Sequence, residues 1–229
     1  MRGAQGGEGV EASFWKSKWK KGEIGFHNDD VNVVLTRHWK ELNLPTRSRI
    51  FVPLCGKSQD MRWLARRGHQ VVGVELSEIA CTQFFGDYDV PFSKDRSGSF
   101  TCFESEEVRI LCGDFFQLSA HDLGAAIGFW DRAALVALPP SMRADYAHKM
   151  SRLLPVGSVG LLASFTYPQE EKKGPPFSVS EDEVHELYGR SFEIERLADE
   201  DIIDTEAHFR DRWGLSALRR QVYRLRRRF

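Results

Sequence analysis

The clearest arrangement of apolar and polar positions lies in residues 48–78. Residues 50–54 form a short apolar run that enters a turn at Cys55-Gly56, and residues 71–74 form a second apolar run that ends on Glu75. Short continuous apolar runs of this kind are typical of strands that are buried on both faces. We therefore predict two neighbouring strands of a parallel sheet.

The segment between the two runs has the spacing of a helix. Met61, Leu64 and Ala65 recur at helical intervals. Ser58 is suited to cap the start of this helix and Gly68 is suited to end it. The segment therefore predicts one βαβ unit, and such units bind ligands at the carboxyl ends of their strands.

Similar patterns predict the remaining elements. Further helices are expected from Ser13 and over residues 29–42, 77–85, 141–154 and 180–189. Further strands are expected over residues 99–103, 108–112, 125–130, 158–165, 191–197 and 219–227, the last two as an antiparallel pair. Loops are expected over residues 91–99 and 166–178 and between the last two strands.

The turn after the first strand limits the choice of ligand. Glu75 stands at the tip of the second strand, about 20 residues beyond the turn, where an acid usually holds a ribose. Gly56 is the only glycine of the turn, so the three-glycine cradle for a dinucleotide is missing. A phosphate-binding loop is also excluded, because Phe51 occupies the position of its first glycine. A ligand with a ribose but no phosphate fits better, and S-adenosyl-L-methionine is such a ligand.

A charged pair follows the strand at residues 125–130. Asp131 and Arg132 stand at its carboxyl end, where burial is costly unless the charges are paired or used in function. One interpretation is an Asp-Arg interaction that caps the next helix. The alternative, which we favour because open α/β sheets bind ligands at strand tips, is that Arg132 faces a cofactor and an acceptor.

Several long motifs resemble one known family. Val-Pro-Leu-Cys-Gly-Lys-Ser at residues 52–58 and the segment from Gly68 to Ser77 are similar to the thiopurine S-methyltransferase family. The similarity extends to Phe14-Trp15 with Trp19, Gly25-Phe26-His27, residues 130–137, Gly174-Pro175-Pro176-Phe177 and the arginine-rich closing strand. It covers roughly residues 13–227 and is closer to the shorter, bacterial branch.

The resemblance implies a fold and a domain organisation. The fold would be α/β and Rossmann-like: a doubly wound, mostly parallel sheet of seven strands, with an antiparallel last strand and an amino-terminal helical cap. Residues 1–12 would be a disordered amino terminus and residues 13–229 a single domain, in which residues 13–47 form cap helices over the cofactor site. The cofactor would be S-adenosyl-L-methionine, with S-adenosyl-L-homocysteine as the product.

The resemblance also changes the interpretation of the aromatic residues near the amino terminus. Trp15 and Trp19 are four residues apart on one helical face, which by itself favours packing on the sheet. The resemblance instead implies that they cover the cofactor and that Phe26 contacts the acceptor. His27 is interpreted as a structural hydrogen-bond donor.

The remaining cofactor residues follow from the same comparison. Asp114 and Phe115 would lie beside the adenine, although Asp114 after a glycine also suits a turn. The full expected cofactor set is Trp15, Trp19, Leu54, Gly56, Glu75, Asp114, Phe115 and Arg132.

The predicted reaction is methyl transfer to an aromatic or heterocyclic thiol. A thiolate is already a strong nucleophile, so no general base is strictly needed. Arg132 and Arg210 are the candidate catalytic residues, because a guanidinium beside a thiol lowers the pKa of that thiol. Arg210 and Phe26 are the candidate acceptor-binding residues, and the identity of the second arginine stays open.

The composition of the chain limits the kinds of partner that we expect it to bind. The chain has 229 residues and a net charge of −1, which does not favour a polyanionic partner. It has no run of 18 apolar residues and no signal-peptide pattern at residues 1–10, so we expect a cytoplasmic protein without membrane contact. Its four cysteines lack metal-ligand spacing, and we expect no metal. The arginines at residues 219–228 suit a solvated strand edge better than nucleic-acid binding, and we expect a monomer.

Three alternatives remain beside the thiol acceptor. The acceptor could be an inorganic selenium or tellurium species, as the bacterial branch suggests. The chain could instead be a catalytically silent module that binds S-adenosyl-L-methionine and regulates a partner. A nucleotide-dependent oxidoreductase is disfavoured by the missing glycine triad.

Overall fold

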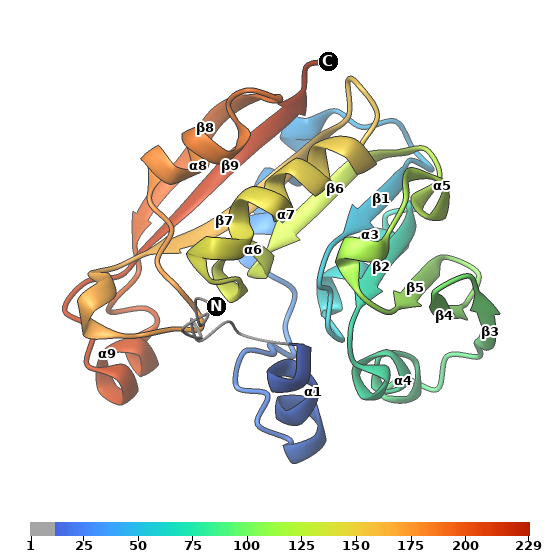
Figure 1. Cartoon of the computed structure of the whole chain (residues 1–229), viewed down its shortest axis with the longest axis horizontal. Helices are drawn as coiled ribbons and strands as arrows, with labels where there is room; N and C mark the ends of the chain where they lie inside the picture. Colours follow the sequence, from blue (N-terminus) through green and yellow to red (C-terminus); the bar gives the residue numbers. More distant parts are fainter. Residues whose placement is uncertain (1–11) are drawn as a thin grey trace, which may run out of the picture.

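The computed structural model describes residues 12–229, which form a twisted sheet covered by helices on both faces (Figure 1). The sheet has nine strands in the order β3-β4-β5-β2-β1-β6-β7-β9-β8. The strand bounds are β1 Arg49–Val52, β2 Gln70–Glu75, β3 Ser93–Ser97, β4 Phe100–Glu104, β5 Val108–Cys112, β6 Ala126–Arg132, β7 Val159–Thr166, β8 Phe192–Asp201 and β9 Arg219–Arg227.

The five central strands β5, β2, β1, β6 and β7 are parallel. Antiparallel strands extend the sheet at both sides: β4 and β3 beside β5, and β9 and β8 beside β7. The chain runs outward from β1 in one direction through β2 and in the other through β6. The carboxyl ends of β1 and β6 therefore meet at the switch point where doubly wound sheets bind ligands.

Most of the helices form two layers, one on each face of the sheet. Their bounds are α1 Ala12–Lys21, α2 Val33–His38, α3 Gln59–Arg66, α4 Glu78–Gly86, α5 Ala120–Leu123, α6 Ala134–Ala137, α7 Pro140–Leu153, α8 Glu181–Tyr188 and α9 Ala207–Trp213. Single turns of 3-10 helix lie at Trp39–Leu42, Phe115–Gln117 and Gln169–Glu171.

Successive side chains along a strand point to opposite faces of the sheet, and each face has its own apolar core. Phe51 packs with the core formed by α5, α6, α7 and α8, whereas its neighbours Ile50 and Val52 pack with the core formed by α2, α3 and α4. Phe129 and Trp130 of β6 divide between the two cores in the same way. This alternation is the two-residue period of a strand with both faces buried.

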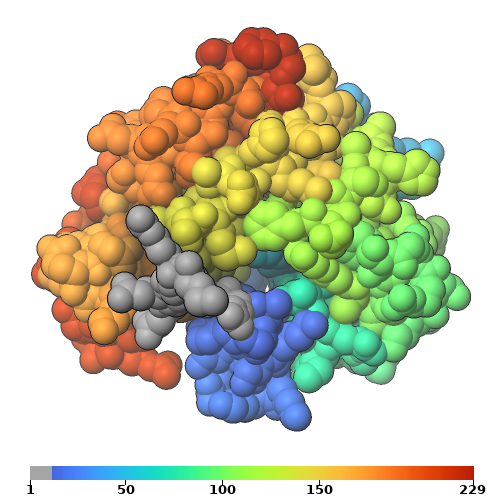
Figure 2. Space-filling model, viewed as in Figure 1, coloured from blue at the N-terminus to red at the C-terminus, as the bar shows by residue number. Residues whose placement is uncertain are grey.

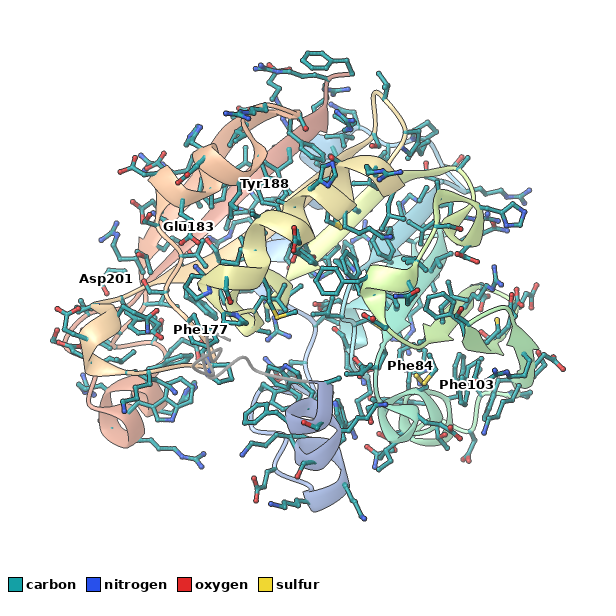
Figure 3. All side chains as sticks on the ribbon, in the orientation of Figure 1. Phe84, Phe103, Phe177, Glu183, Tyr188 and Asp201 are labelled. Carbon is teal, nitrogen blue, oxygen red and sulfur yellow. The ribbon has the colours of Figure 1, made fainter. Side chains whose placement is uncertain are left out.

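A buried ion pair joins α7 and α8, which lie on the same face of the sheet. The guanidinium of Arg143 on α7 is 1% exposed, and its Nη1 donates to both carboxylate oxygens of Glu183 on α8 at 2.6 and 2.7 Å. Figure 3 labels Glu183 and Phe177, and the Phe177 ring lies 5.8 Å from the same guanidinium. Ser180 caps α8 by accepting from the N–H of Glu183, whereas the Glu183 side chain binds Arg143 instead of returning to Ser180.

Several elements differ from the sequence prediction, among them the short helices α5 and α6, which were not expected. The sheet has nine strands rather than seven, and β3 lies within the predicted loop 91–99. A small helix, α9, lies where a loop was predicted between the last two strands, and Phe209 anchors it in a third apolar cluster with Leu215 and Leu218. The predicted antiparallel pairing of the last two strands is confirmed.

The two segments predicted at the amino terminus, residues 1–12 and 13–47, can be compared with the structure only in part. Of the segment 1–12, all but Ala12 lies outside the described residues. Within the predicted cap 13–47, α1 lies near the carboxyl ends of the central strands (Figure 1), whereas α2 packs in one core with residues of β1 and β7. Among residues 12–229, no helix is long and apolar enough to cross a membrane.

Candidate active site

A cavity of about 330 Å³ opens at the carboxyl ends of β1, β2, β5 and β6. Helix α1 and the loop after it close one side, and the beginnings of α6 and α7 close another. Figure 2 shows α1, in blue, lying against the green and yellow segments at this edge. Every site residue predicted from the sequence lines this cavity except Arg210.

The turn between β1 and α3 has an unusual backbone. Leu54 and Gly56 have positive φ angles of 44° and 54°. The N–H of Cys55 donates to the carbonyl of Val74 at 2.9 Å, which ties the turn to β2. Ser58 then caps α3 by accepting from the N–H of Asp60. Glycine is favoured at position 56 because L side chains rarely adopt this φ.

Glu75 is the buried acid at the tip of β2. Its Oε2 accepts from the N–H of Gly56 at 2.9 Å, and its Oε1 accepts from the N–H of Ser77 at 2.7 Å. Burial raises the pKa of this carboxyl, and the two backbone N–H groups oppose that rise. The acid is therefore fixed in place and faces the same cavity as the turn.

Trp15, Trp19 and Phe26 form an aromatic cluster on one side of the cavity, which we call the lid. The ring of Phe26 packs edge-on against Trp15 at 5.3 Å and against Trp19 at 5.6 Å between ring centroids. A Cβ added at Gly56 would lie 3.4 Å from the Trp19 ring. The backbone of the turn and the lid are thus close neighbours, and a larger residue at position 56 would fill the space between them.

Asp114 and Phe115 lie at the tip of β5. Asp114 Oδ1 accepts from the N–H of Phe116 at 2.9 Å and so caps a 3-10 turn, as the turn interpretation of this residue predicts. Phe115 is buried, and its ring lies 4.8 Å from that of Tyr146. Both residues also line the cavity, so the contact with an adenine stays a prediction.

Asp131 and Arg132, at the tip of β6, point in different directions. Asp131 points into the core, where its Oδ2 accepts from the Tyr146 hydroxyl at 2.8 Å and burial raises its pKa to about 7. Arg132 lines the cavity, and no carboxylate within residues 12–229 forms an ion pair with it. Ala133, with φ of 63°, then turns the chain into α6. The two side chains do not pair with each other, contrary to the structural interpretation of this dipeptide.

Arg210 lies outside the cavity. It is half exposed on α9, where its guanidinium donates to Asp204 at 2.6 Å and to Asp211 at 3.2 Å. Arg212 of the same helix faces the lid, because its Nη1 lies 3.9 Å from the position of a Cβ on Gly25. The structure therefore brings Arg212, rather than Arg210, next to the loop that carries Phe26.

Sequence reasoning missed several lining residues. His27, Lys57, Met142 and Tyr146 all line the cavity. Met142 and Tyr146 carry no local signal, because they are ordinary apolar-face positions of α7. His27 follows Phe26 in a motif that was noted, but a single histidine gives no indication of what its ring faces. Within the described range, no group of three His, Cys, Asp or Glu could hold a metal ion.

Comparisons with known proteins agree on one family. The model of the family described as thiopurine S-methyltransferase matches residues 10–228. A protein of that name from Xanthomonas campestris is 44% identical over 218 residues, which cover 95% of this chain and all of the relative. One from Shewanella oneidensis is 45% identical over 219 residues, covering 96% of this chain and all of the relative.

Solved structures show the same fold at low sequence identity. A S-adenosylmethionine-dependent methyltransferase from Anabaena variabilis superposes with a TM-score of 0.67 at 13% identity, covering 95% of both chains. A Burkholderia thailandensis N1-methyltransferase, solved with 1,6-didemethyltoxoflavin and S-adenosylhomocysteine, gives a TM-score of 0.62 at 17% identity, covering 95% of this chain and 87% of that one.

Proposed function

The chain belongs to the thiopurine S-methyltransferase family of S-adenosylmethionine-dependent methyltransferases, and on that premise we propose that it methylates a small aromatic or heterocyclic thiol. Arg132 carries the proposal. It is a cation without an ion-pair partner in the described chain, and it lines the same cavity as the aromatic lid residue Phe26. An aromatic lid beside a free guanidinium suits a flat acceptor that reacts as an anion.

The residues present fit the methyl donor. Glu75 is held by two backbone N–H groups at the tip of β2, which suits a pair of ribose hydroxyls. Gly56 leaves open the space that a Cβ would take beneath Trp19. When bound, S-adenosyl-L-methionine supplies a methyl group on a positively charged sulfur, which makes that methyl electrophilic.

The chain's own residues contribute positioning and charge. Trp15, Trp19 and Phe26 cover one side of the cavity and so narrow the space in which an acceptor can be held. Such positioning can lower a barrier by about 7 to 11 kcal/mol at best. Arg132 favours the thiolate over the thiol, because an opposite charge nearby lowers the pKa of an acid.

The other acceptors stay predictions. No observation among residues 12–229 favours inorganic selenium or tellurium species over organic thiols. A silent regulatory module is disfavoured, since the relatives at 44% and 45% identity are named as methyltransferases.

The test has two stages with the purified full-length protein. Calorimetric titration with S-adenosyl-L-homocysteine is expected to show micromolar binding. Mass spectrometry of reactions with S-adenosyl-L-methionine then compares arylthiols and heterocyclic thiols with the phenols and anilines of the same shape. Methylation of the thiols alone supports the proposal. Methylation of the oxygen or nitrogen analogues without thiol products overturns it.

A further inference from the structure

His27 is the one histidine among the described residues that lines the cavity. Its side chain is only 9% exposed, and its Nε2 lies 3.0 Å from Oδ1 of Asp29. His27 directly follows Phe26, the residue expected to contact the acceptor, and both residues line the same cavity. Methyl transfer to a ready-made thiolate leaves this histidine without a role.

The contact with Asp29 fixes the tautomer of the ring. Asp29 is 93% exposed, and a carboxylate at neutral pH can only accept a hydrogen bond. Nε2 of His27 must therefore carry the hydrogen, which leaves a lone pair on Nδ1 when the imidazole is neutral. No described residue forms a hydrogen bond with that Nδ1.

The charges around the ring favour its neutral form. Burial lowers the pKa of His27 first, and the nearby cations Lys57 and Arg132 lower it further, whereas Asp29 raises it. Lys57 is itself paired with Asp87 at 2.8 Å, which moderates its effect. At neutral pH the ring is thus an unprotonated base in an aromatic cavity beside a cation.

We propose that His27 is the general base for acceptors whose thiol is still protonated at neutral pH, and that Asp29 positions its ring. The inference rests on the proposed function and extends its substrate class from ionised arylthiols to alkyl thiols. Nδ1 takes the proton from the acceptor S–H, and the sulfur electron pair left behind forms the new bond to the methyl carbon. The bond from that carbon to the donor sulfur breaks, its electron pair stays on that sulfur, and the proton later leaves from His27 to solvent.

The two acceptor classes should respond differently to loss of the base. A simple alkyl thiol is less acidic than the cysteine side chain, whose pKa is near 8.5, so at neutral pH it is ionised to less than a few per cent and proton removal can gain about 30-fold or more. A nitro-substituted arylthiol is already ionised and gains nothing. A structural role for His27 would affect both acceptors equally.

The experiment compares wild type, His27→Gln and the matched control His185→Gln, in which an exposed histidine of α8 is replaced. Steady-state kcat/KM is measured with 2-phenylethanethiol and with 4-nitrothiophenol at neutral pH. For His27→Gln we expect a loss of about 30-fold or more with the alkyl thiol and less than about a three-fold change with the arylthiol. The alkyl-thiol deficit should shrink as the pH approaches the pKa of that thiol, and His185→Gln should behave as wild type.

A second readout requires no methyl donor. Nitrogen-detected NMR of the donor-free protein is expected to show His27 as the Nε2–H tautomer at neutral pH, titrating below an ordinary histidine. An Nδ1–H tautomer, or equal losses with both thiols in His27→Gln, overturns the general-base role. Absence of any thiol methylation by the wild type, with His27 in the expected tautomer, refutes the proposed acceptor class instead.

Discussion

The carboxylate of Glu75 accepts a hydrogen bond from the backbone N–H of Gly56 at 2.9 Å, so the turn after β1 and the tip of β2 are fixed to each other. The same carboxylate accepts from the N–H of Ser77, where α4 begins. One side chain thus sets the relative positions of two loops at the carboxyl ends of the central strands. It does so while buried, which costs free energy that the two hydrogen bonds offset in part.

Glu75→Ala should weaken the binding of S-adenosyl-L-homocysteine by about ten- to hundred-fold, because hydrogen bonds to a charged group contribute about 1.5 to 3 kcal/mol. Calorimetry on the variant and on Glu193→Ala, an exposed position of β8, measures the difference. Unchanged affinity in Glu75→Ala would remove this acid from the nucleoside site.

Arg132→Ala should keep the fold and lose at least about ten-fold in kcat/KM with an arylthiol, which corresponds to about 1.4 kcal/mol. The guanidinium has no ion-pair partner in the described chain, so its removal leaves no buried carboxylate unpaired. Arg190→Ala, at an exposed position after α8, is the control. Circular dichroism checks the fold, and wild-type kinetics in Arg132→Ala would refute the assignment.

The two arginines of α9 can be separated by their partners. Arg210 already binds Asp204 and Asp211, whereas Arg212 lies against the lid at Gly25. We expect Arg212→Ala to raise the acceptor KM about five-fold and Arg210→Ala to change it less than about two-fold, since Arg210 lies outside the cavity and its exposed ion pairs are screened by solvent. The reverse order would restore the sequence-based choice of Arg210.

Asp131 should make stability fall as the pH rises. Its pKa is about 7 in the folded protein against 3.8 for the free group, so the folded chain holds a proton that the unfolded chain releases. Tyr146 and Tyr188, both buried and uncharged at neutral pH, face this carboxyl. Between about pH 5 and about pH 8 the wild type should lose about 2.5 kcal/mol relative to Asp131→Asn. Urea unfolding at the two pH values measures this difference, and parallel curves for the two proteins would contradict it.

The pair Arg143–Glu183 predicts a stability effect without a catalytic one. Glu183→Ala leaves a guanidinium that is 1% exposed without its partner, which should cost about 3 to 5 kcal/mol of unfolding free energy. Replacing both residues, as Arg143→Met with Glu183→Leu, should restore most of it, because apolar packing can substitute for a buried ion pair. Urea unfolding of the single and double variants tests this. A double variant as unstable as the single one would contradict it.

The central sheet was predictable from the sequence because its strands are continuous apolar runs. β3 was not, since all five of its residues are polar and only pairing with β4 holds them in a strand. The site residues likewise divide into those that the sequence could predict and those that it could not. Glu75 and Arg132 stand at strand tips, where the fold alone brings side chains together. Arg212 and Tyr146 reach the cavity region from distant segments, and nothing in their local sequence reports that contact.

The position of β9 between β7 and β8 determines the order in which the sheet can be completed during translation. Residues 192–201 leave the ribosome first, but they have no strand to pair with until residues 219–227 have followed. Until then the apolar edge strand β7 is open to other nascent chains, which is a recognised cause of aggregation. A chain that lacked β9 would thus keep the strands around the cavity but leave β7 as an open edge of the sheet.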